Sequence, residues 1–152
     1  MIMSRSTRIT GADFSGSYSI IPALSYQLNA SLVRARNLTT KAFLPYIPSD
    51  NFRQHLIWNV ATKANNEAYI QFGHQFVSKQ NRFEPGSDYA EPPKAYSLFS
   101  MNAGRSWHIK RQKISASMSI DNLFNASYKD YMNRYRYYVH DMGRNIAIRL
   151  AY

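Results

Sequence analysis

The chain has 152 residues, enough for one domain, and it contains no cysteine, which excludes a disulfide framework and thiol chemistry. Its formal net charge of +10 suggests nucleic acid, anionic lipid or an acidic ligand as a partner, although the basic residues are scattered and do not form a block. No run of about 18 apolar residues is present, which excludes a transmembrane helix, and the N-terminus lacks the apolar region of a signal peptide.

Three stretches in the first part of the chain alternate between apolar and polar residues, as strands do. The first predicted strand covers residues 8–20 and is closed by Pro22. The second covers residues 24–36 and has the clearest two-residue period in the chain, with Leu24, Tyr26, Leu28, Ala30 and Leu32 on one face. The third covers residues 52–62, and the three together favour an all-β fold.

Four more strands are predicted in the rest of the chain. They cover residues 67–80, 95–107 and 113–123, followed by the C-terminal stretch. In that last stretch Ile146, Ile148, Leu150 and Tyr152 would share one face, whereas helical spacing would scatter them. One face of each strand should therefore lie against an apolar environment, either a protein core or lipid.

The predicted connections alternate in length. Residues 21–23, 63–66 and 108–112 are short connections, whereas 37–50, 81–94 and 125–144 are long ones. Such alternation predicts an up-and-down antiparallel sheet with short turns at one end and long loops at the other, as in outer-membrane β-barrels. The apolar face would then contact lipid, and the face rich in serine, asparagine and glutamine would line a wet interior.

Two further expectations follow from a barrel. Aromatic residues near strand ends would form interfacial girdles, and the candidates are Tyr18, Tyr69, Trp107, Tyr128 and Tyr152. One side of the sheet should carry Leu28, Leu32, Trp58, Ile70, Phe72, Met101, Met118, Ile146 and Leu150.

The C-terminal sequence SIDNLFNASYKDYMNRYRYYVHDMGRNIAIRLAY resembles the end of TonB-dependent outer-membrane receptors. In that family an Asn-Leu-Phe followed closely by Tyr ends the penultimate strand, and Gly-Arg-Asn opens the last one. The corresponding residues here, together with those of the last strand, are Asn122, Leu123, Phe124, Tyr128, Gly143, Arg144, Asn145, Ile146, Ile148, Leu150 and Tyr152. The earlier segments ITGADFSGSYSI, AFLPYIPSDNFRQHLIWN and FGHQFVSKQNRF also resemble the family.

The resemblance implies that residues 1–152 form about seven C-terminal strands of an antiparallel, up-and-down transmembrane β-barrel of about 22 strands. The family's plug domain and TonB box are absent from this sequence, the number of strands is odd, and the family commonly ends on a later aromatic residue. The expected location is the outer membrane of a Gram-negative bacterium. The expected partners are outer-membrane lipid, the upstream plug and barrel strands, and the TonB complex, reached through the N-terminal region. The expected role is uptake of a scarce solute, such as a ferric siderophore or another metal chelate, without a cofactor.

No catalytic constellation and no metal-ligand spacing among the histidines is evident, so neither an enzyme nor a metal site is expected. The loop residues Arg134, Tyr135, Arg136 and Tyr137 are candidates for binding an anionic ferric chelate. Their alternative role is loop packing at a girdle. The alternative function is that of a small soluble basic β-domain that binds nucleic acid. In such a domain the apolar face would be buried. If the chain is instead part of a barrel, nucleic acid is not an expected partner.

Overall fold

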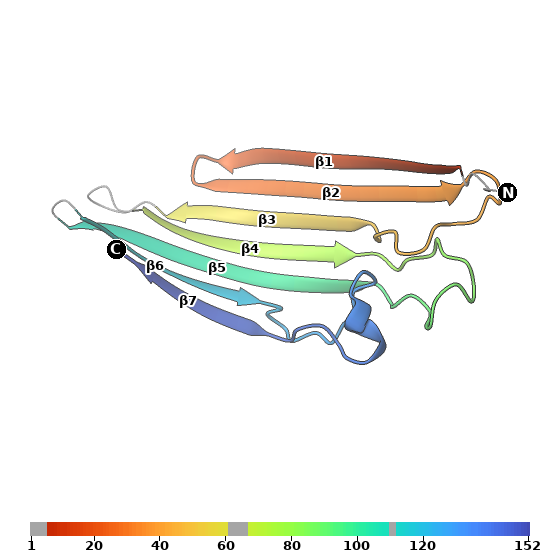
Figure 1. Ribbon diagram of the computed structural model, residues 1–152. Helices are drawn as coiled ribbons and strands as arrows, with labels where there is room; N and C mark the ends of the chain where they lie inside the picture. The colour runs from red at the N-terminus through yellow and green to blue at the C-terminus, as the bar shows by residue number, and fades with distance from the viewer. Residues whose placement is uncertain (1–5, 61–66, 110–111) are drawn as a thin grey trace.

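The computed structural model describes residues 6–60, 67–109 and 112–152, which form one antiparallel sheet. Each strand pairs with its neighbour in sequence, from β1 to β7 (Figure 1). The strands are β1 (Thr7–Ile21), β2 (Leu24–Asn37), β3 (Asn51–Val60), β4 (Glu67–Val77), β5 (Tyr96–Ile109), β6 (Gln112–Asp121) and β7 (Asn145–Ala151), and a short 3-10 helix, η1 (Arg134–Tyr137), precedes β7. The predicted all-β, antiparallel fold is confirmed. Among the described residues no helix is long and apolar enough to cross a bilayer.

Two predicted strands were too long. β4 ends at Val77, although Ser78 still donates its N–H to the carbonyl of Asp50 (2.9 Å). The chain then enters a loop in which the Gln80 side chain donates to the carbonyls of Ile47 and Pro48. β6 ends at Asp121 because Asn122 takes the left-handed conformation (φ 49°), which begins a turn. The predicted connection 108–112 is shorter than expected, since β5 continues to Ile109 and β6 begins at Gln112. The predicted end of the third strand, 61–62, lies outside the described residues.

The register of the sheet separates two faces. Residues directly opposite each other in an antiparallel pair point to the same side. The pairs Trp58↔Ile70, Ile70↔Ala103, Ala103↔Met118 and Met118↔Ile148 run across five strands. By the same register all nine residues predicted to share a face do so, because no shift occurs between β2 and β7. We call this side the apolar face and the opposite side the polar face.

The apolar face is open. Trp58, Phe72 and Ile148 are 52%, 50% and 74% exposed. Among the described residues, the buried apolar ones are Ala35, Val77 and Tyr131, and the first two lie on the polar face at the end of the sheet where the long connections emerge. The sheet therefore does not cover its apolar side, as a sandwich would.

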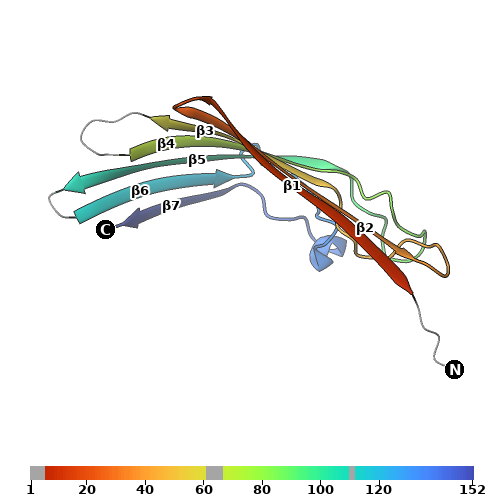
Figure 2. The same ribbon diagram turned by 90° about the horizontal axis from the view of Figure 1, so that it is seen from above.

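The two ends of the sheet differ. The long connections 38–50, 78–95 and 122–144 lie at one end, called here the loop end, and together form the loop cluster (Figure 1). The other end, where β1 passes into β2 and where β3 and β5 end, is called the turn end. Seen from above, the sheet is curved and twisted, so that β1 crosses the direction of β7 (Figure 2). This is the shape expected of a barrel wall.

A close cross-strand packing marks the polar face near the turn end. The ring of Tyr69 lies over Gly104, its direct partner in the register, so closely that a Cβ on this glycine would come within 2.6 Å of the ring. Tyr69 therefore lies on the polar face and not in an aromatic girdle on the apolar face. Trp107, by contrast, does lie on the apolar face, opposite Ile114.

Candidate functional site

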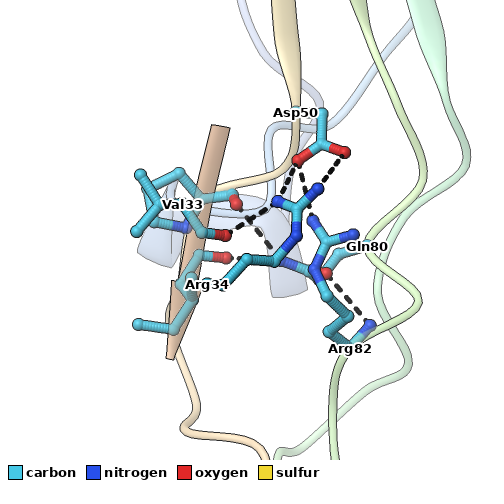
Figure 3. A network of polar contacts seen from close by, with 7 residues as sticks. Val33, Arg34, Asp50, Gln80 and Arg82 are labelled. Atoms are coloured by element: carbon cyan, nitrogen blue, oxygen red, sulfur yellow. Dashed lines mark hydrogen bonds and ion pairs between the residues drawn. The ribbon is translucent and has the colours of Figure 1, made fainter. Parts of the chain in front are cut away.

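The loop cluster is attached to the sheet by an ionic network (Figure 3). Arg34 of β2 binds both carboxylate oxygens of Asp50, with N–O distances of 2.5 and 2.9 Å, and Arg82 donates to the same carboxylate at 2.9 Å. Gln80 is almost fully buried and donates to the carbonyls of Ile47 (2.6 Å) and Pro48. These contacts fix two long connections to each other and to β2.

A second network fixes the third connection to the second. The carboxylate of Asp88 accepts hydrogen bonds from Arg136 and Tyr137 of η1. Arg136 is only 4% exposed, and its guanidinium lies over the rings of Tyr131 and Tyr137, at 4.4 and 4.8 Å from their centroids. These contacts hold the segment 130–137 against the loop that contains Asp88.

This arrangement shifts the pKa values of both titratable partners of Arg136, Asp88 and Tyr137. Burial raises the pKa of Asp88, but the hydrogen bonds from Tyr137 and from the backbone of Tyr89, together with the charge of Arg136, outweigh it and lower the pKa overall. The hydrogen bond to Asp88 raises the pKa of Tyr137 to about 12.

The four ligand candidates from the sequence therefore divide into two pairs. Arg136 and Tyr137 are engaged with Asp88, whereas Arg134 and Tyr135 are exposed, the tyrosine by 72%. The helix turn that carries them begins at Asn133, whose side chain accepts the N–H of Tyr135. A ligand role for these residues stays a prediction, and Arg134 and Tyr135 are the two that solutes can reach.

The Asn-Leu-Phe motif builds the turn after β6. The side chain of Asn122 accepts from the N–H of Ala126 (2.7 Å) and donates to the carbonyls of Ala126 (2.8 Å) and Met142 (3.3 Å). Leu123 donates its N–H to the carbonyl of Phe99, and the Phe124 ring packs edge-on against the Phe99 ring at 5.2 Å. The motif thus closes the base of the last long connection.

The Gly143-Arg144 pair meets this turn from the other side. The side chain of Asn125 accepts the N–H of Arg144 at 2.9 Å, and a Cβ on Gly143 would come within 2.8 Å of the same oxygen. The signature residues on both sides of the connection are therefore brought together. Tyr128 lies further into the loop with its ring 4.6 Å from that of Tyr96, while Tyr152 lies just after β7 and is fully exposed.

A cavity of about 490 Å³ lies between the polar face and the loop cluster. Its strand side includes Asp13, Asn29 and Arg53, and its loop side includes Asp130 and Met132. Tyr96 donates to Asp130 (2.5 Å), which fixes the loop wall to β5. Amide, carboxylate and guanidinium groups in one cavity can bind a polar, oxygen-rich solute.

The roles of Asp88, Asp130 and the residues lining this cavity are not evident from the sequence. These residues come from segments far apart in the chain, and each alone has the composition of ordinary loop or strand residues. Two arginines and five tyrosines in residues 128–138 were the one local signal. The described residues contain no group of three or more His, Cys, Asp or Glu side chains suited to a metal ion. Among the histidines, the Nδ1 of His55 contacts Gln71 on the polar face, and His74 stacks on Phe99 on the apolar face.

Comparison with known proteins identifies a solved structure that shares this fold. No family model matches the sequence, and no curated protein matches it. Among solved structures, the copper transporter OprC is similar, with a TM-score of 0.80 and 19% sequence identity over 96% of this chain and 23% of that chain. At this identity the similarity shows a shared fold. The chain spans less than a quarter of the transporter it matches.

Proposed function

We propose that the chain forms part of the wall of an outer-membrane transport barrel of the TonB-dependent receptor type. The observation that carries this proposal is the open apolar face on a curved sheet whose opposite face is polar. In lipid such a face is stable, whereas in water it would be an apolar patch of the kind that marks a membrane or protein contact. The fold shared with a transporter and the resemblance of the C-terminal motif support the same role.

The proposal also gives the sheet an orientation. The loop cluster faces the outside of the cell, and the short turns face the periplasm. β1 and β7 are the outer strands of the sheet, so further barrel strands would pair with them. A plug domain would contact the polar face, and the TonB complex would act on that plug and not on the strands described here.

The proposed cargo is a ferric siderophore or another metal chelate. Arg53 and the amides of the cavity can donate hydrogen bonds to chelate oxygens, and the exposed Arg134 and Tyr135 are available to capture an anionic chelate at the rim. The similar structure is that of a copper transporter, which makes a copper chelate a specific candidate within this class. The proposed role is transport and not catalysis. Binding of nucleic acid by a soluble domain is less well supported, because that reading requires a buried apolar face.

The lipid contact can be tested with the two tryptophans of the chain, both of which lie on the apolar face. In vesicles of brominated phosphatidylcholine, bromine should quench the fluorescence of Trp58 and Trp107. The matched control is Tyr69→Trp in a W58F/W107F background, which places one tryptophan on the polar face and should be quenched much less. Equal quenching of both faces, or none, would contradict the proposal.

The transport role requires a test in cells. Disruption of the gene for the full-length protein should reduce accumulation of radiolabelled iron or copper supplied as a chelate, and the intact gene should restore it. Substitution of Arg53 by Gln should lower uptake with normal abundance in the outer membrane. Unchanged uptake of every chelate tested would rule out this cargo class.

A further inference from the structure

An arginine-lined groove lies at the loop end, apart from the cavity of the polar face. Its volume is about 380 Å³. Its lining includes Arg8, Thr10, Arg34, Arg36, Phe43 and Arg82.

The strand residues of this groove belong to the apolar side of the sheet. Arg8 lies directly opposite Arg36, and Thr10 lies directly opposite Arg34. Both pairs have the same parity as the Ala12↔Leu32 pair in the same ladder, so their side chains leave the sheet on the apolar face. β1 and β2 therefore change from apolar to basic residues toward the loop end. The groove marks the border of the apolar face.

The charges around the groove are not balanced. Asp50 pairs with Arg34 and Arg82, and Glu84 accepts the backbone N–H of Phe43. Four guanidiniums thus meet two carboxylates, and within 6–60, 67–109 and 112–152 no carboxylate pairs with Arg8 or Arg36.

Three observations describe the binding capacity of the groove. Like charges directly opposite each other in a ladder are destabilising, so the Arg8–Arg36 pair favours an added anion. The guanidinium of Arg36 is held 4.5 Å from the centre of the Phe43 ring. The buried Nε of Arg82 has no hydrogen-bond partner among the described residues.

We infer that this groove binds the phosphate of an anionic lipid headgroup in the outer leaflet. The inference rests on the proposed function, which places the loop end at the outer surface. A guanidinium fork matches two phosphate oxygens, and phosphate pairs with arginine more strongly than a neutral acceptor does. The occupant is a lipid because the groove continues into the apolar face, where acyl chains can lie against Leu28 and Leu32 below the headgroup. A soluble polyanion has no acyl chains that could contact the apolar face beside the groove.

The test uses the full-length protein in zwitterionic micelles doped with phosphatidic acid, with binding measured by native mass spectrometry and titration calorimetry. The double variant R8Q/R36Q removes the two unpaired guanidiniums and leaves the Asp50 network intact. It should bind phosphatidic acid about tenfold more weakly. R105Q is the matched control, because Arg105 lies on the same face near the turn end, over the Trp107 ring. R105Q should bind as the unaltered protein does, and R8K/R36K, which keeps the charge, should bind with intermediate affinity.

The outcomes separate the groove from the proposed function. Equal affinity of R8Q/R36Q and the unaltered protein would overturn the inference. Equally tight binding of inorganic phosphate or of an oligonucleotide, lost in the same variant, would overturn the lipid assignment. Quenching of Trp58 by brominated lipid does not depend on these arginines, so quenching without phosphatidic acid binding would leave the proposed function standing. Absence of quenching in the unaltered protein would overturn both.

Discussion

At the scale of single residues, Asn122 shows how one side chain can define a connection. It combines a left-handed backbone with three side-chain hydrogen bonds that close the turn after β6. Asparagine tolerates this conformation better than most residues, and its amide can donate and accept at once. Asparagine meets both requirements in this position.

Replacement of Asn122 by Ala should lower the free energy of unfolding by about 2–4 kcal/mol, because it removes buried hydrogen bonds and strains the backbone. Asn122→Gly is the matched control, since glycine accepts the backbone conformation and loses only the hydrogen bonds. It should cost about 1 kcal/mol less than Asn122→Ala. Denaturant unfolding in detergent measures both values. Native stability of Asn122→Ala would contradict the role of the turn.

The Asp88–Tyr137 contact predicts a pH dependence of loop docking. The pKa of Asp88 is lowered in the folded protein. Its contribution to the stability of loop docking is therefore complete above its pKa in the unfolded chain, about 4, and is lost as the pH falls below that value. Tyr137 has a pKa raised to about 12, so its contribution is complete below the unfolded value of about 10 and is lost as the pH rises toward 12. Docking should be constant between these limits.

Spectroscopic titration tests this dependence. The ultraviolet difference between the unaltered protein and Tyr137→Phe should show one tyrosine that ionises near pH 12. Asp88→Asn removes the main cause of the shift and should move that ionisation toward the ordinary pKa of about 10. An ionisation of Tyr137 near pH 10 in the unaltered protein would show that the contact is absent.

At the scale of elements, side-chain pairs between neighbouring strands pack tightly at a few places on the polar face. Tyr69 on β4 covers Gly104 on β5, so a methyl group at position 104 must displace the ring. Gly104→Ala should destabilise the sheet by roughly 1–3 kcal/mol. The double variant Tyr69→Ala/Gly104→Ala should lose less than the sum of the single variants, by about 1 kcal/mol. Additive losses in this cycle would show that the two positions are independent.

The last strand gives a direct test of the two faces. Ile148 lies on the apolar face opposite Met118, and its neighbour Ala147 lies on the polar face opposite Ser119. Ile148→Arg places a charge against lipid and should reduce the stability of the membrane-inserted protein by about 2–4 kcal/mol. Ala147→Arg, one position away, should cost much less. A reversed order in vesicle-folding measurements would show that the faces are assigned the wrong way round.

At the scale of the whole molecule, the exposed apolar face and the open outer edges of β1 and β7 determine how the chain behaves in solution. Unpaired backbone groups cost several kcal/mol each in lipid, and an open apolar face promotes association in water. The 152-residue chain expressed alone should aggregate in buffer or require detergent. Size-exclusion chromatography in buffer tests this expectation. A sharp monomer peak with cooperative melting would contradict the barrel-wall proposal and favour a soluble β-domain.

The sequence by itself determined the strands and their faces. A two-residue period is a local property, so Leu28, Trp58 and Ile148 could be assigned to one side before any pairing was known. The alternation of short and long connections likewise gave the up-and-down order, because sequence neighbours in such a sheet pair directly. Strand ends were less accurate at Val77, after which Gln80 binds the loop carbonyls of Ile47 and Pro48, and at Asp121, which is followed by a left-handed residue.

The tertiary structure alone decided which loop residues act together. Arg136 and Tyr137 were candidate ligands from their local sequence, yet a carboxylate 48 residues from Arg136 engages both of them. Arg8 and Arg36 are adjacent only through the β1–β2 ladder, and the cavity combines strand residues with a loop more than 70 residues away in the chain. Long-range contacts of this kind depend on the curvature of the sheet and on loop packing, and neither leaves a periodic signal in the sequence.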